Sequence, residues 1–104
     1  MKRDDALKLI GKCLPESAIV ITANGLMVRQ LYHFVDRHLN FYMVGSMGLC
    51  PTLAAGFSHC MKIPVIAIEG DGNALMGLSG FPVAAKVSSA AFVHLGKLCR
   101  SAGY

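Results

Sequence analysis

Two glycine-bearing turns have the composition of phosphate-binding loops. Residues 45–48 read Gly-Ser-Met-Gly, and residues 70–73 read Gly-Asp-Gly-Asn. Each turn follows an apolar run and precedes a helical pattern. Glycine lets the backbone approach an oxygen closely, and the N–H groups at a helix N-terminus attract negative charge. The two turns together predict a ligand that carries phosphate.

The second turn also contains a carboxylate, that of Asp71. A carboxylate would repel a nearby diphosphate unless a cation lay between them. Mg²⁺ prefers oxygen ligands shared between one or two protein groups and a bound phosphate, so Asp71 is a candidate metal ligand. A lone Gly-Asp-Gly after a strand is equally compatible with a simple turn, and it is the second glycine turn that favours a ligand.

Other familiar motifs are not matched. Leu75 occupies the place of the third glycine of a dinucleotide fingerprint, and no Gly-Lys-Ser/Thr follows either turn. The four cysteines form no CxxC pair and no metal-ligand spacing, which favours free, mostly buried thiols in a reducing compartment. Cys50, beside Pro51, is interpreted as a packing residue rather than a nucleophile.

A parallel α/β sheet would position these turns. Helical and apolar patterns alternate along the chain, which predicts an open parallel sheet with helices on both faces. Ligands bind at the carboxyl ends of strands in such sheets, where the loops at 24–26, 45–48 and 69–73 would lie. Strands are expected at 18–21, 41–44, 64–68 and 90–95. Helices are expected at 4–14, capped by Asp4 or Asp5, at 26–35, from the first glycine turn to about Met61, and at 74–86 with a break near Gly80 and Pro82.

Length and composition exclude several classes of protein. A chain of 104 residues has room for one domain, and its 54% hydrophobic content excludes a disordered tail. The net charge of +4 comes from scattered basic residues, so nucleic-acid binding is not expected. The apolar stretches are strand-sized and no apolar leader follows Lys2 and Arg3, so we expect no membrane span and a cytoplasmic location.

Three segments resemble a known family. Residues 65–72, Val-Ile-Ala-Ile-Glu-Gly-Asp-Gly, resemble the Gly-Asp-Gly half of the thiamine diphosphate motif. Residues 41–48, Phe-Tyr-Met-Val-Gly-Ser-Met-Gly, resemble the preceding loop of the sulfopyruvate and phosphonopyruvate decarboxylases. Residues 24–32, Asn-Gly-Leu-Met-Val-Arg-Gln-Leu-Tyr, resemble the first cofactor-side turn and helix of that group. The likeness covers roughly residues 1–95, in the family's order and spacing.

The resemblance implies a diphosphate-binding domain of a thiamine diphosphate-dependent 2-oxoacid decarboxylase. Asp71 would bind Mg²⁺, and Gly45 would present its carbonyl to the aminopyrimidine. Met47 would be the apolar wedge that bends the cofactor, although without the resemblance a core role would be preferred for it. The implied cofactor contacts are Gly25, Leu26, Gly45, Ser46, Met47, Gly70, Gly72 and Asn73.

The sequence also departs from the family pattern. The family's motif closes with an Asn-Asn pair after the next strand, whereas no Asn or Asp follows Asn73 here. We therefore expect a single domain over 1–104 that is incomplete after about residue 95. The glutamate that activates the pyrimidine belongs in this family to another domain or subunit. The resemblance thus implies a partner, a small anionic 2-oxoacid substrate, and little or no turnover by this chain alone.

Two alternatives stay open at this point. The chain could be a non-catalytic remnant that keeps the fold without binding the cofactor, a reading that the missing Asn pair favours. It could also be a generic phosphate- or nucleotide-binding module of the doubly wound class.

Overall fold

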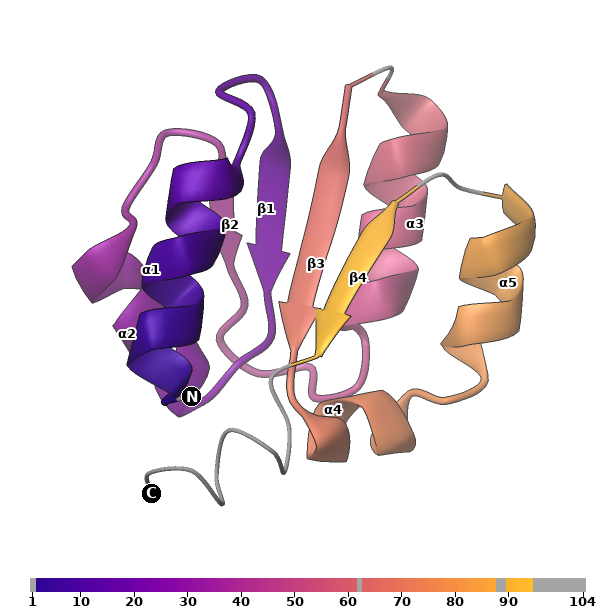
Figure 1. Cartoon of the computed structure of the whole chain (residues 1–104). Helices are drawn as coiled ribbons and strands as arrows, with labels where there is room; N and C mark the ends of the chain where they lie inside the picture. Colours follow the sequence, from indigo (N-terminus) through magenta and orange to yellow (C-terminus); the bar gives the residue numbers. More distant parts are fainter. Residues whose placement is uncertain (1, 62, 88–89, 95–104) are drawn as a thin grey trace.

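Helices and strands alternate along the chain (Figure 1). The computed structural model describes residues 2–61, 63–87 and 90–94. The strands are β1 (Ile19–Thr22), β2 (Asn40–Tyr42), β3 (Val65–Glu69) and β4 (Ala91–His94). The helices are α1 (Arg3–Cys13), α2 (Leu26–Phe34), α3 (Cys50–Cys60), α4 (Asp71–Met76) and α5 (Gly80–Val87).

The four strands form one parallel sheet in the order β2-β1-β3-β4. β1 and β3 are central, with Ile19 opposite Val65 in register, and β4 continues the ladder from β3. Parallel strands need crossover connections, and each crossover here carries helix. The expected open parallel sheet is confirmed.

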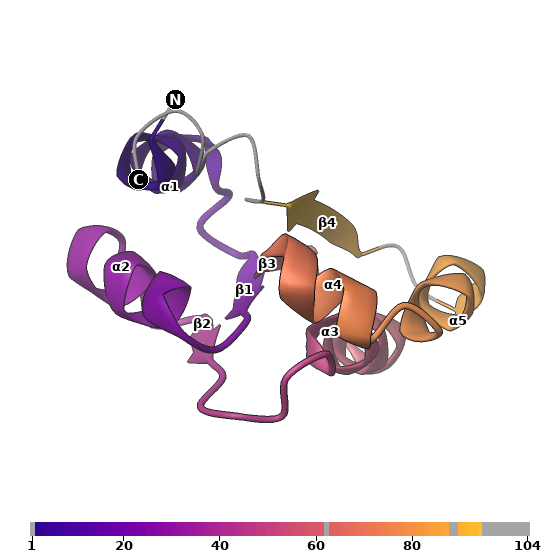
Figure 2. The same cartoon turned by 90° about the horizontal axis from the view of Figure 1, so that it is seen from below.

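Helices cover both faces of the sheet (Figure 2). On one face Leu7 of α1 and Leu31 of α2 pack against Val20 and Ile68. On the other face Ala54 of α3 packs with the alternate strand residues, including Ile21 and Ala67. β1 and β3 are therefore apolar on both sides, as expected for central parallel strands.

Four of the helices, α1, α2, α3 and α5, run opposite to the strands, so their N-terminal ends lie at the carboxyl edge of the sheet (Figure 1). The short helix α4 lies across this edge (Figure 1). None of the described helices is long and apolar enough to cross a membrane. The cysteines in the described part of the chain are free thiols, but only Cys50 is buried, so the expectation of mostly buried thiols is wrong for Cys13 and Cys60.

Predictions about α1 and β2 are wrong. Neither Asp4 nor Asp5 caps α1, because the N-cap is Lys2 and Asp4 instead accepts a hydrogen bond from Gln30 of α2 (2.7 Å). β2 ends at Tyr42 rather than at residue 44, since it is an edge strand and Val44 is 94% exposed. The helix predicted to follow the first glycine turn is confirmed: α3 begins at Cys50, because Gly45, Ser46 and Gly48 have positive φ angles that a helix cannot contain.

Two points differ in the second half, and one prediction is confirmed. Glu69 belongs to β3 rather than to a loop, because the ladder to β4 continues through it. The helix expected from residue 74 begins earlier, at Asp71, and the predicted break near Gly80 is confirmed: it lies at residues 77–79 and separates α4 from α5. At this break the backbones of Gly77 and Gly48 lie so close that a Cβ at Gly77 would overlap the carbonyl oxygen of Gly48, so only glycine fits there. The expected strand end at Leu95, and the expected incompleteness beyond it, lie outside the described residues.

Candidate functional site

All three loops predicted to bind the ligand meet at one cavity on the carboxyl edge. The cavity has a volume of about 480 Å³. Its wall combines the turn after β1, the first glycine loop and the turn after β3, together with the start of α1. The residues that line it are Arg3, Asn24, Leu26, Met27, Met47, Gly70, Asp71, Gly72, Asn73 and Met76.

A second cavity of about 650 Å³ adjoins the first. The two cavities share Asn24 and Leu26, and Gly25 and Gly45 line the second one. Eight of the nine residues predicted for the site therefore line these two adjoining cavities. A single elongated molecule can contact both of them.

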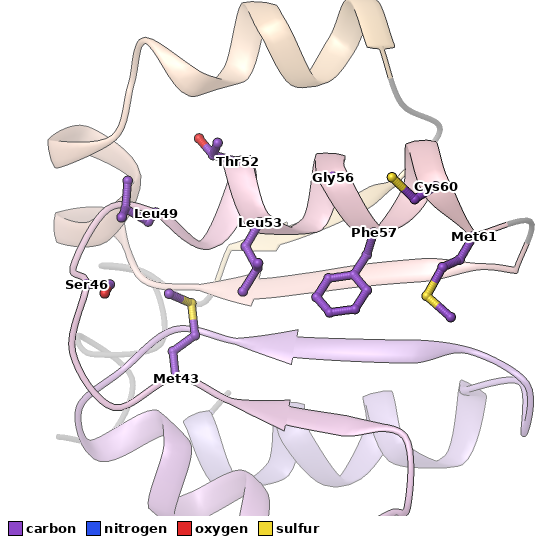
Figure 3. Close-up of a pocket in the computed structure, with 9 residues that line it drawn as sticks. All are labelled: Met43, Ser46, Leu49, Thr52, Leu53, Gly56, Phe57, Cys60 and Met61. Carbon is purple, nitrogen blue, oxygen red and sulfur yellow. The ribbon is translucent and has the colours of Figure 1, made fainter.

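Ser46 is the predicted site residue that the structure places elsewhere. It lines an apolar groove of about 620 Å³ between the end of β2 and α3, together with Met43, Leu53 and Phe57 (Figure 3). The backbone of Ser46 is in the left-handed region, with φ +54°. This turn directs residue 46 and residue 47 to different cavities.

A hydrogen bond joins the two glycine turns. The backbone N–H of Gly48 donates to the side-chain oxygen of Asn73 (3.0 Å). This bond holds the first glycine loop against the start of α4. Asn73 thus fixes the relative position of the two turns, a role that its sequence position alone does not indicate.

Asp71 is exposed and lies on the cavity wall at the first residue of α4. One of its carboxylate oxygens accepts a hydrogen bond from the N–H of Gly72 (3.0 Å). Within the described residues, no three His, Cys, Asp or Glu side chains gather as a metal site. A cation at Asp71 would need amide, phosphate or water oxygens for its other ligands, which is the donor set that Mg²⁺ accepts.

Asn24 is a residue that the sequence reasoning did not assign to the site. Its side-chain oxygen is buried and has no hydrogen-bond partner in the described part of the chain. Buried polar atoms are normally paired, and this one belongs to a residue that lines both cavities. The orphaned oxygen fits a ligand that brings a cation or a hydrogen-bond donor. Asn24 is the first residue of the segment that resembles the family's first cofactor-side turn, and this resemblance was the signal that could have pointed to Asn24 as a site residue.

Met47 is half exposed and lies on the wall of the first cavity. The alternative that Met47 is a core residue is therefore wrong. Other apolar side chains near the two cavities are also exposed, including Leu26 and Val44. This edge of the molecule therefore presents exposed apolar side chains around the two cavities.

Glu69 lies two residues before Asp71 in a contrasting environment. Its side chain is 0% exposed, and neither carboxylate oxygen has a hydrogen-bond partner among the described residues. Burial raises the pKa of its carboxyl to about 7. Burial and the nearby charge of Glu69 raise the pKa of the Cys50 thiol to about 12, so Cys50 is a packing residue, as predicted. Alternation with Val65 and Ala67 on the buried face could have identified Glu69.

The resemblance to known proteins covers most of this chain. No family model matches the chain. It is 40% identical over 77 residues to the sulfopyruvate decarboxylase subunit beta of Methanocaldococcus jannaschii, covering 74% of this chain and 41% of that protein. It is 39% identical over 82 residues to the phosphonopyruvate decarboxylase of Streptomyces hygroscopicus, covering 79% of this chain and 20% of that protein. It is 32% identical over 95 residues to the sulfopyruvate decarboxylase subunit beta of Methanococcus maripaludis, covering 91% of this chain and 51% of that protein.

The predicted resemblance to these decarboxylases is confirmed. The chain spans about half of the length of these relatives or less. Two of the relatives are named as subunits of a decarboxylase. The resemblance is to proteins named as decarboxylases, and it covers 74–91% of this chain.

Proposed function

We propose that this chain is the thiamine diphosphate- and Mg²⁺-binding half of a 2-oxoacid decarboxylase of the sulfopyruvate or phosphonopyruvate type. The observation that carries the proposal is the meeting of the three predicted loops at one cavity with Asp71 on its wall. The relatives at 32–40% identity support the reaction class. The substrate would be a small anionic 2-oxoacid.

The donor set of the cavity fits the proposed metal and diphosphate. Asp71 would hold Mg²⁺ through its exposed carboxylate, and the unpartnered oxygen of Asn24 offers a further hard ligand or acceptor. A Cβ built at Gly25 or Gly72 would meet no atom within 4 Å, so phosphate oxygens can approach the backbone there. Gly70, Leu26 and Asn73 complete the wall on the diphosphate side.

The residues of the first glycine loop would position the rest of the cofactor. Met47 would support the bent conformation through its half-exposed side chain, and Gly45 would present its carbonyl in the adjoining cavity. Thiamine diphosphate, when bound, supplies an electron sink for the pair released as CO₂ leaves. The contribution of this chain is orientation of the cofactor rather than proton transfer.

A partner subunit or domain would supply the glutamate that activates the pyrimidine. The matched segment makes up 41% of a protein named as a subunit but 20% of the phosphonopyruvate decarboxylase, whose chain is therefore about twice as long. A function supplied by a separate subunit in one relative can thus be built into the same chain in the other. The exposed apolar surface around the cavities suits such a partner. We expect little or no turnover by this chain alone.

Thermal unfolding of the chain with thiamine diphosphate and Mg²⁺ tests the proposal. A ligand that binds the folded state at a hundred times its Kd stabilises it by about 2.7 kcal/mol. We expect stabilisation only when both components are present, and its loss in Asp71→Ala. Glu16→Ala, which removes an exposed acid before β1, is the control and should respond like the unaltered chain.

The same assay separates the alternatives. No response to thiamine diphosphate with Mg²⁺ would contradict the proposal and favour a remnant that keeps the fold without the cofactor. A response to ATP or to a flavin in its place would favour a generic nucleotide-binding module.

A further inference from the structure

Arg3 brings a positive charge into the candidate cofactor site from an unexpected element. It is the first residue of α1, and its partly buried side chain lines the same cavity as Asn24 and Asp71. The N-terminal end of α1 lies at the carboxyl edge because this helix runs opposite to the strands (Figure 1). No motif in the sequence points to Arg3.

A chain of hydrogen bonds between α1 and α2 holds the guanidinium. Arg3 Nη1 donates to the side-chain oxygen of Gln30 (3.3 Å), and Gln30 Nε2 donates to Asp4 (2.7 Å). Since the amide nitrogen of Gln30 faces Asp4, its oxygen is directed to Arg3. The guanidinium is thereby tied to α2, whose first turn also lines the cavity through Leu26 and Met27.

The charges on the cavity wall complement each other. Of the described residues that line this cavity, Arg3 and Asp71 are the charged ones. Asp71 alone would repel an anionic ligand, whereas a guanidinium attracts phosphate and can donate two parallel hydrogen bonds to it. Mg²⁺ at Asp71 and the guanidinium of Arg3 would place positive charge at two points around one diphosphate.

We propose that Arg3 is a phosphate-binding residue of this site, held for that role by Gln30 and Asp4. The inference deepens the proposed function and rests on it for the identity of the whole ligand. The claim about phosphate can be tested separately with inorganic pyrophosphate, which lacks the thiamine part.

The experiment measures binding of Mg²⁺-pyrophosphate to the full chain by calorimetry. We expect Arg3→Gln to raise the Kd about tenfold or more, as is typical for loss of a charge-assisted hydrogen bond. Lys12→Gln is the matched control: it removes one positive charge from the same helix, but about 14 Å along its axis from Arg3. The control should leave the Kd within about twofold.

Salt dependence distinguishes contact with phosphate from a structural role. The difference in Kd between the unaltered chain and Arg3→Gln should shrink as salt rises from 0.05 to about 0.5 M, since salt screens the lost attraction. Equal Kd values, or a difference that salt does not change, would overturn the inference. The unfolding midpoint of each variant without ligand shows that it is folded.

Failure of this inference is distinguishable from failure of the proposed function. Binding of pyrophosphate that depends on Arg3, without binding of thiamine diphosphate, would support the inference and overturn the proposed function. If Arg3→Gln and the unaltered chain bound thiamine diphosphate equally well, the proposed function would be supported and the inference about Arg3 would be overturned. A chain that binds neither compound would overturn both.

Discussion

The carboxyl edge of the sheet has a packed half and an open half. In the packed half, Gly48 and Gly77 meet backbone to backbone: a Cβ at Gly77 has no room, and one at Gly48 would fit only tightly. In the open half, a Cβ built at Gly25 or Gly72 would meet nothing within 4 Å. Glycine is required by contact in the first case, whereas at Gly25 it is required by a φ of +95° and at Gly72 by neither. Gly25 and Gly72, in the open half, line the two candidate cofactor cavities.

The acidic residues repeat this contrast. Glu69 is fully buried beside Cys50 in the packed half, and Asp71 is exposed in the open half. They are separated only by Gly70, which carries the chain from the strand into the next helix. Residue type therefore does not decide which carboxylate is available to a metal. The burial that each position acquires on folding decides it.

The largest effect is expected from Gly77→Ala. Its Cβ would overlap the carbonyl oxygen of Gly48, and backbone atoms on both sides cannot yield without moving the α4–α5 junction. We expect a loss of about 3 kcal/mol or more in the free energy of unfolding, measured with urea. Gly72→Ala, in the open half, should cost nothing and could gain up to about 1 kcal/mol. Similar losses in both variants would erase the distinction between the two halves.

Glu69→Gln should change how stability depends on pH. Because burial raises the pKa of Glu69 from 4.5 to about 7, the folded chain holds this proton more tightly than the unfolded chain. The associated stability is fully present below pH 4.5 and is lost as the pH rises through 7, a loss of up to roughly 3 kcal/mol. The amide variant cannot lose that proton, so it should exceed the unaltered chain in stability at pH 8.

Urea unfolding at pH 5, 6, 7 and 8 measures this effect. Glu16→Gln, which alters an exposed acid, should keep the slope of the unaltered chain. If the free energy of unfolding of Glu69→Gln depended on pH as steeply as that of the unaltered chain, the carboxyl of Glu69 would not be the buried group with the raised pKa.

Asn73→Ala should have the smallest of the three effects. It removes the acceptor for the N–H of Gly48, so we expect a loss of about 1 kcal/mol and faster amide exchange at Gly48. Asn24→Ala in the open half removes an oxygen with no described partner and should cost less. A larger loss of unfolding free energy in Asn24→Ala than in Asn73→Ala would contradict the contrast between the packed and the open half.

Much of the fold could be predicted from the chain itself. Short apolar runs separated by helical patterns indicated a parallel sheet, since strands buried on both faces must be apolar throughout. Pro51 lies in the first turn of α3, where proline is tolerated because its missing N–H would have no partner in the helix. The errors fall where contacts between distant residues override local pattern. Asp4 does not cap α1 because it accepts a hydrogen bond from Gln30, and Glu69 extends a strand because β4 pairs with it.

The candidate site divides in the same way. The composition of the two glycine turns, and their position after strands, were enough to place Asp71 and its neighbours on one edge of the sheet, because parallel strands end together there. Arg3 could not be assigned in this way, and although the loop at 24–26 was placed on this edge, nothing in the sequence singled out the side chain of Asn24. Arg3 reaches the cavity only because α1 packs against α2 and Gln30 holds its guanidinium, and the oxygen of Asn24 is orphaned only by the packing around it. Sequence determines which groups are present and their order along the chain, whereas burial and long-range contacts, which arise only on folding, decide which of them face a ligand.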